Sequence, residues 1–88
     1  MKLKYKFVVR EVAGQAVALP VGEDAKNFNG MIKLNSVGEY IFKLLENDVT
    51  TEEIIKSITE KYDVTPEDAR PSVEGFLETL KQKAIITE

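Results

Sequence analysis

The feature that most constrains the fold of this chain is an abrupt change of hydrophobic period near its middle. The apolar run at residues 31–34 stops at Asn35, and from there the apolar side chains recur at the spacing of a helix. They are Val37, Tyr40, Ile41, Leu44 and Leu45. Ser36 and Glu39 have the spacing of a capping box, so we expect Ser36 to cap this helix. A short strand should therefore lead directly into an amphipathic helix with a buried apolar face.

Two further strands are predicted before that helix. Residues 2–10 alternate apolar side chains with lysine or arginine, and this period of two is typical of a half-buried strand. After a break at residues 13–14, the apolar run at residues 15–19 ends at Pro20, because proline cannot donate to a strand ladder. Residues 22–29 have the composition of a loop. The expected sheet has three antiparallel strands.

Two more helices are predicted after the first. Thr50 and Glu53 form a second capping-box pattern, and that helix should end at Asp63. Thr65 followed by Pro66 begins the longest helix. The apolar face of this last helix consists of Ala69, Val73, Phe76, Leu77, Leu80 and Ala84. The predicted fold class is α+β, a three-stranded antiparallel sheet followed by three helices, in the order of a winged helix-turn-helix.

Length and composition limit the classes of protein to which this chain can belong. Its 88 residues fit one domain, residues 1–88, and its 43% of hydrophobic residues argues against disorder. A net charge of −3 gives no attraction to nucleic acid or to an anionic membrane. There is no cysteine, hence no disulfide framework and no thiolate metal site. No apolar run approaches transmembrane length, so we expect a cytoplasmic protein.

The winged-helix order makes a nucleic-acid-binding or transcription-regulatory domain the alternative function. A helix that reads a groove needs lysine, arginine, asparagine or glutamine facing phosphates and base edges. Between Thr65 and Ala84 the chain instead carries four acidic and three basic residues. This balance disfavours the alternative.

No catalytic residue, metal site or cofactor is predicted. The chain has no histidine and no cysteine, so the usual general base and the best nucleophile are missing. Glu52 and Glu53 are adjacent, and side chains of adjacent helical residues point about 100° apart. Carboxylates in a first helical turn more simply complement the helix dipole. We therefore expect a protein that is not an enzyme.

A distinctive motif spans the junction between the third strand and the first helix. Its residues are Leu34, Asn35, Gly38, Ile41, Leu44 and Leu45. The pattern resembles the PqqD-like family, and the resemblance continues from residue 30 to residue 86. Ala84 departs from it, because members often have glycine before the final apolar pair. The turn at residues 46–48 departs as well, since the family usually has a glycine there.

The resemblance implies a peptide modification chaperone without chemistry of its own. Such proteins bind the leader segment of a ribosomally made precursor peptide and present it to a modifying enzyme, often a radical S-adenosylmethionine (radical SAM) protein. Members hold the leader between the third strand and the third helix. The contacts expected in this chain are Gly30, Met31, Ile32, Lys33 and Leu34 on the strand, and Arg70, Val73, Glu74 and Leu77 on the helix.

An unpaired sheet edge provides a physical basis for that binding mode. An extended peptide can add to such an edge as a further strand, and a second copy of the chain can do the same to form a homodimer. Strand alternation assigns Ile32 and Leu34 mainly to the core, with Met31 and Lys33 on the other face. For Val73 and Leu77 the helical phase leaves two roles open, in the core or along the peptide groove.

Overall fold

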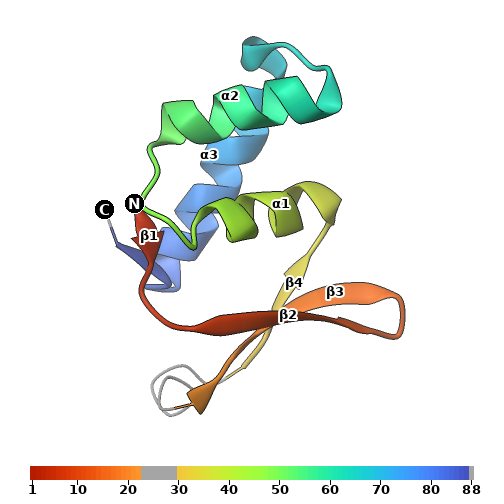
Figure 1. The fold of residues 1–88 in the computed structure, drawn as a ribbon, viewed down its shortest axis with the longest axis vertical. Coiled ribbons are helices and arrows are strands. Elements are labelled where there is room, and N and C mark those ends of the chain that lie inside the picture. Colours follow the sequence, from red (N-terminus) through yellow and green to blue (C-terminus); the bar gives the residue numbers. More distant parts are fainter. Residues whose placement is uncertain (23–29, 88) are drawn as a thin grey trace.

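A computed structural model describes residues 1–22 and 30–87. In chain order its elements are β1 (Lys2–Leu3), β2 (Phe7–Val12), β3 (Gln15–Pro20), β4 (Ile32–Leu34), α1 (Ser36–Leu44), α2 (Thr51–Tyr62), α3 (Pro66–Gln82) and β5 (Ile86–Thr87). The predicted α+β class, with three antiparallel strands and three helices, is confirmed. Figure 1 shows β2, β3 and β4 at one end of the molecule and α2 at the other, with α1 between them. The loop predicted at residues 22–29 falls almost entirely outside the described residues.

The three-stranded sheet has the order β2-β3-β4, so β4 lies at an edge. A two-residue turn connects β2 to β3, and both of its residues have positive φ, 53° at Ala13 and 80° at Gly14. Two positive φ values are typical of the type I′ turn, whose twist matches that of the flanking strands. The turn therefore fixes the register in which Val12 pairs with Gln15.

The single strand predicted over residues 2–10 is wrong in one respect. β1 ends at Leu3 and β2 begins at Phe7, and β1 forms a separate two-stranded sheet with β5. The physical reason is long-range: the Leu3 N–H donates to the Leu45 carbonyl at 3.0 Å, and the Lys4 N–H donates to the Ile85 carbonyl at 2.7 Å. These acceptors lie far away in the sequence, so the alternating pattern alone does not reveal the break.

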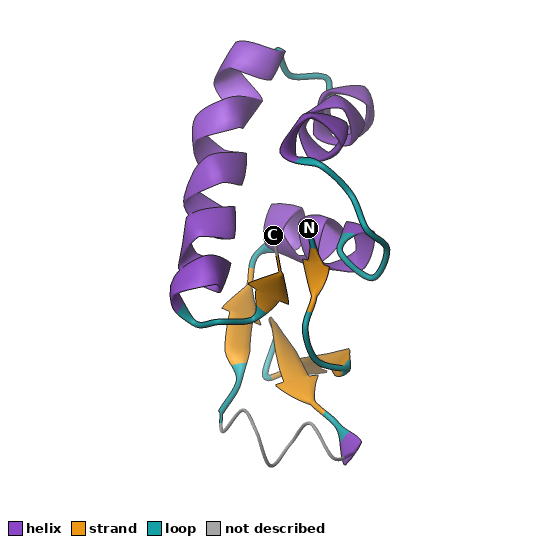
Figure 2. Ribbon diagram, turned by 90° about the vertical axis from the view of Figure 1, so that its left-hand side faces the viewer, coloured by secondary structure: helices purple, strands orange, loops and turns teal. Residues whose placement is uncertain are grey.

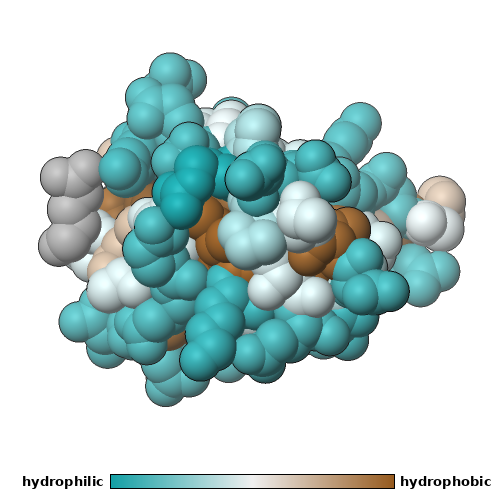
Figure 3. Space-filling view, turned by 90° about the horizontal axis from the view of Figure 1, so that it is seen from above, coloured by the Kyte–Doolittle hydropathy of each residue, from teal (hydrophilic) through white to brown (hydrophobic). Residues whose placement is uncertain are grey.

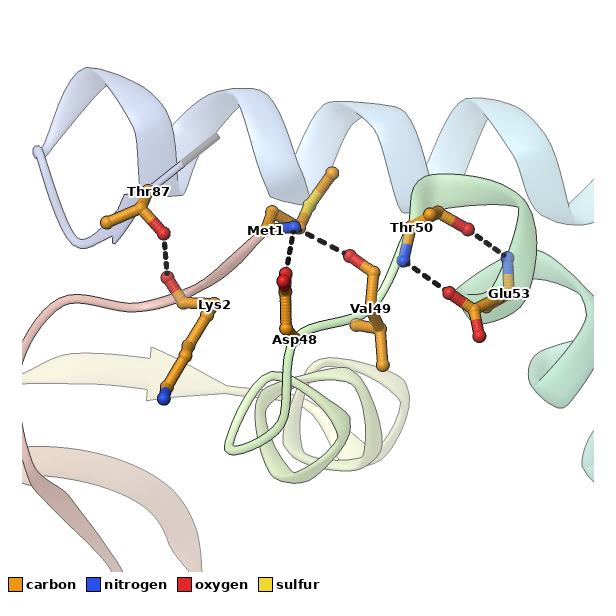
Figure 4. A network of polar contacts seen from close by, with 7 residues as sticks. All are labelled: Met1, Lys2, Asp48, Val49, Thr50, Glu53 and Thr87. Carbon is orange, nitrogen blue, oxygen red and sulfur yellow. Dashed lines mark hydrogen bonds and ion pairs between the residues drawn. The ribbon is translucent and has the colours of Figure 1, made fainter.

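Polar contacts of the first residues anchor β1 to the helical part of the molecule (Figure 4). The amino group of Met1 donates to the Asp48 carboxylate and to the Val49 carbonyl, each at 2.8 Å. This hydrogen bond holds the pKa of the Asp48 carboxyl below its ordinary value. From β5, the Thr87 hydroxyl donates to the Lys2 carbonyl of β1 at 3.2 Å. The chain before β2 is thus attached both to β5 and to the connection between α1 and α2.

The predicted Ser36–Glu39 capping box is also wrong. Asn35 is the N-cap of α1, because its side-chain oxygen accepts from the Gly38 N–H at 2.7 Å. A capping box needs a carboxylate or amide three residues after the cap, and that position here is glycine. Glu39 instead forms an ion pair with Lys43 at 3.3 Å.

The caps predicted for the other two helices agree with the structure. At α2 the Thr50 hydroxyl accepts from the Glu53 N–H at 3.1 Å, and the Glu53 carboxylate accepts from the Thr50 N–H at 2.9 Å. The predicted end of α2 at Asp63 is its C-cap, in the left-handed region. At α3 the Thr65 side chain accepts from the Asp68 N–H at 3.2 Å.

Figure 2 shows α3 along the helical part of the molecule, with the other two helices beside it. The core lies between the three helices and the inner face of the sheet. Its largest fully buried side chains are Phe42, Leu34, Ile41, Leu45, Ile54, Leu80, Ile85 and Val73. Seen from above, the outer surface is mainly hydrophilic, and most of the apolar residues in view lie between hydrophilic ones (Figure 3). Burial of these apolar side chains is the main force that holds the three helices on the sheet.

A stabilising substitution is expected at the end of α3. Ala84 has a φ of 57°, and the Ile85 N–H donates to the Leu80 carbonyl at 2.9 Å, the bond pattern of a Schellman cap. Because glycine adopts this conformation without steric strain, Ala84→Gly should raise the free energy of unfolding by about 0.5–1 kcal/mol. Urea denaturation measures the change. Ala69→Gly, inside the same helix, is the control and should destabilise; a loss of stability in both variants would contradict the assignment.

Candidate functional site

The edge strand β4 presents two different faces. Ile32 and Leu34 point into the core and are only 7% and 2% exposed, whereas Met31, just before the strand, is 55% exposed and Lys33 is exposed as well. Gly30, with a φ of 135°, is exposed ahead of them. This agrees with the alternation expected from the sequence. The side chains of the core face hold β4 in place and leave its other face in solvent.

The hairpin determines which way the backbone groups of β3 point. In a hairpin with a two-residue turn, the pair of residues that flanks the turn is hydrogen-bonded, and here that pair is Val12 and Gln15. Backbone groups alternate sides along a strand, so those of Gln15 point toward β2. Those of Ala16 and Ala18 therefore point the other way, toward β4.

The same alternation continues into β4. Ala16 and Ala18 pair with Leu34 and Ile32, so the N–H and C=O of Lys33, between them, are directed away from β3. The Leu34 carbonyl, which faces β3 in this scheme, also accepts from the Gln15 side-chain amide at 2.8 Å. Within residues 1–22 and 30–87 no strand pairs with this outer side of β4. The open edge of β4 thus offers one donor and one acceptor at Lys33.

A hollow of about 150 Å³ opens where β4 passes into α1. It is lined by Asn35, Val37, Gly38, Ile41, Ser72 and Phe76. Gly38 keeps it open, because a Cβ at that position would come within 3.3 Å of the Phe76 ring and 3.2 Å of the Asn35 side-chain oxygen. The side of α3 that faces the junction of β4 and α1 is therefore the side of Ser72 and Phe76.

A second hollow, of about 340 Å³, continues the first along α3. Val37 and Ser72 line both. The further lining residues are Ile58, Tyr62, Val64, Asp68, Ala69 and Val73. We call the two together the α1–α3 groove; its walls are mainly apolar, and one carboxylate, that of Asp68, lines its far end.

The helix residues expected from the sequence do not all lie along this groove. Arg70 donates to both carboxylate oxygens of Glu52, at 2.7 and 2.9 Å, and this bond raises the pKa of the arginine. Glu74 and Leu77 lie beside the start of α2, where they line a different hollow together with Thr51. Only Val73 lines the α1–α3 groove.

The sequence left two roles open for Val73 and Leu77, in the core or along the peptide groove, and their burial decides between them. Val73 is 0% exposed and Leu77 is 3% exposed, and both belong to the central hydrophobic cluster. They are core residues, and Val73 also forms part of the floor of the groove. The sequence interpretation missed Ser72 and Gly38 as groove residues and assigned Phe76 to the core alone. The spacing of four residues between Ser72 and Phe76 is the signal that marks their shared side.

Neither a metal-binding cluster nor a membrane-spanning helix is found in the part of the chain that the structure describes. No three histidine, cysteine, aspartate or glutamate side chains come together there in a way that could hold a metal ion. No helix in these residues is long and apolar enough to cross a membrane.

Comparison with known proteins identifies the family. Residues 15–86 match the family model described as coenzyme PQQ synthesis protein D (PqqD). The chain belongs to the PqqD family. Among solved structures, TbiB1 in complex with the TbiA(beta) leader peptide is similar to this PqqD family member, with a TM-score of 0.71 and 26% sequence identity over 97% of this chain and 93% of that one. No match was found among curated proteins.

Proposed function

We propose that this chain binds the leader segment of a precursor peptide and presents it to a separate modifying enzyme. The observation that carries the proposal is the outward backbone of Lys33, on an edge strand that is followed directly by Asn35, a lining residue of the α1–α3 groove. TbiB1, which shares the fold, was solved with a leader peptide bound. The family resemblance implies a radical SAM protein as the partner enzyme.

Strand addition at β4 accounts for the backbone part of the binding. An extended leader that pairs with β4 would donate to the Lys33 carbonyl and accept from its N–H, as a neighbouring strand does. The exposed Lys33 side chain would then stand beside the added strand and favour an acidic leader residue there. Met31, exposed on the same face, offers an apolar contact.

The α1–α3 groove accounts for the side-chain part. Where β4 ends, Asn35 and Phe76 border a hollow wide enough for one apolar side chain of the leader. The second hollow, next to Tyr62 and Val64, offers room for another. Two apolar anchors and a few backbone bonds give a modest affinity, since association and ordering of a disordered leader oppose binding by at least about 4 kcal/mol.

Phe76→Ala tests the groove. Removing this ring takes away one wall of the first hollow, and we expect the leader to bind about tenfold more weakly. Fluorescence anisotropy with the labelled leader of the cognate precursor measures the affinity. Circular dichroism must show that the variant is folded at the temperature of the titration.

Tyr5→Ala is the matched control for this experiment. Tyr5 is another half-buried aromatic residue, and it stands edge-on to Phe7 with 6.3 Å between ring centroids without lining either hollow of the groove. Its removal should leave leader affinity within about twofold of the original, since it removes no contact proposed here. Equal binding by Phe76→Ala and the unmodified protein would refute the groove as the binding site.

A further inference from the structure

Another hollow, of about 560 Å³, lies beside the segment that joins β1 to β2. Residues 2–8 line it together with Val21 and Glu46; we call it the N-terminal hollow. We propose that it is a docking site for an acidic segment of the partner enzyme, which places an apolar side chain between the lysines. This inference rests on the proposed function for the identity of the partner.

The backbone around the N-terminal hollow is held in place. The N–H groups of Leu3 and Lys4 donate to carbonyls of Leu45 and Ile85, and the Lys6 carbonyl accepts from the Val21 N–H at 3.0 Å. Met1 fixes the segment from its other end through Asp48 and Val49 (Figure 4). A hollow with such fixed walls can bind a partner without first paying for ordering of its own backbone.

The floor of the hollow is aromatic and apolar. The Phe7 ring packs edge-on against buried Phe42, with 5.2 Å between centroids, and Tyr5 stands edge-on to Phe7 at 6.3 Å. Both Tyr5 and Phe7 are half-buried, so part of each remains open to solvent. An apolar side chain of a partner would cover that remaining surface.

The rim is basic although the chain as a whole is acidic. Among the residues that the structure describes, Lys2, Lys4 and Lys6 line the hollow together with one acid, Glu46, while the net charge of the chain is −3. Lys2 and Lys4 are exposed, and none of the ion pairs found among the described residues involves them. The nearby Asp48 carboxylate is engaged with the Met1 amino group. The rim therefore complements carboxylates of a partner.

Protein carboxylates fit this hollow better than phosphates do. Within residues 1–22 and 30–87 no arginine lines it, whereas arginine is the residue best suited to bidentate phosphate binding. Glu46 would also repel a polyanion. The apolar floor also has no counterpart in a phosphate backbone. An acidic segment with one aromatic or aliphatic side chain matches both the rim and the floor.

Figure 1 shows β1 near the end of α1 and β4 leading into its start. The N-terminal hollow and the proposed leader site therefore lie at opposite ends of this helix. Gly38, in the α1–α3 groove, is near the start of this nine-residue helix, and Glu46 follows the end of the helix. At about 1.5 Å per residue the helix separates the two sites by roughly 12 Å. Both sites can therefore be occupied at once, which would raise the effective concentration of the leader near the enzyme.

Amide chemical-shift mapping on the full chain tests the chemistry of the N-terminal hollow. The probe is a short synthetic peptide of Glu and Asp residues around one Phe, compared with the same peptide made neutral with Gln and Asn. We expect the acidic peptide to shift signals of residues 3–8 and the neutral one to bind about tenfold more weakly at low salt. Equal binding of the two, or no shifts at these residues, would overturn the proposal. Tighter binding of an oligonucleotide or of anionic vesicles would overturn it in favour of a polyanion site.

Charge reversal tests the role of the hollow with the modifying enzyme itself. Lys4→Glu should weaken the complex with that enzyme about tenfold, whereas Lys56→Glu, an exposed lysine on α2, should change it little. The leader affinity of both variants should equal that of the unmodified protein. If Lys4→Glu bound the enzyme with unchanged affinity, the docking site would be refuted and the proposed function would stand. If the unmodified protein bound no leader, the proposed function itself would be refuted.

Discussion

Replacement of Lys33 by proline should abolish measurable leader binding while the domain stays folded. Proline has no N–H to donate, and its ring would occupy the place where an added strand approaches. The β3–β4 ladder should survive, because the backbone groups of Lys33 point away from β3. We expect a loss of more than about tenfold, since a lost hydrogen bond of about 1 kcal/mol adds to the steric exclusion of the peptide.

The control for this variant is Lys33→Ala, which removes the side chain and keeps the N–H. Fluorescence anisotropy of the labelled leader should show near-normal binding to Lys33→Ala and none to Lys33→Pro. Ile32→Pro is a poorer probe of the edge, because Ile32 is buried and its loss damages the core. Normal leader affinity in a folded Lys33→Pro variant would exclude strand addition at β4.

Replacement of Leu77 by aspartate should unfold the domain. Leu77 lies in the central hydrophobic cluster, so the new carboxylate would be buried without a partner. That burial costs several kcal/mol, about the whole stability of a domain of this size. Circular dichroism should show loss of helical signal at a temperature where the unmodified protein is folded.

Thr79→Asp is the matched control, since it introduces the same charge at an exposed position of the same helix. We expect its free energy of unfolding to change by no more than about 0.5 kcal/mol. A Leu77→Asp variant that remained as stable as Thr79→Asp would show that Leu77 is accessible to solvent, as it would be if it lined a peptide groove.

Short-range signals in the sequence were reliable. The change of hydrophobic period at Asn35 placed β4 and α1 correctly, and the Thr50–Glu53 pair located the start of α2. Each of these features depends on residues within one or two helical turns, whose preferences act locally. The predicted cap at Ser36 failed because the capping-box spacing to Glu39 favours Ser36, whereas the adjacent Asn35 suits an N-cap as well and caps the helix without a capping box.

The sides of α3 were harder to assign. Its apolar residues cover more than one side, so the helical phase predicts that Val73 and Leu77 are buried or near a groove but does not say which side meets β4. The packing of α3 against α2 decides this, because it turns Arg70 toward Glu52 and leaves Ser72 and Phe76 facing the start of α1.

The sequence alone determined the family, the α+β class, the order of the elements and the edge strand that leads into α1. These follow from periodicity, caps and a continuous motif, which residues close in the chain encode. Only the tertiary structure decided the break between β1 and β2, the α1–α3 groove and the lysine-lined N-terminal hollow. Each of these depends on contacts between residues far apart in the chain, such as Lys4 with Ile85 and Gly38 with Phe76. The hydrophobic pattern of a segment reports its own secondary structure and does not specify which distant residues it will contact.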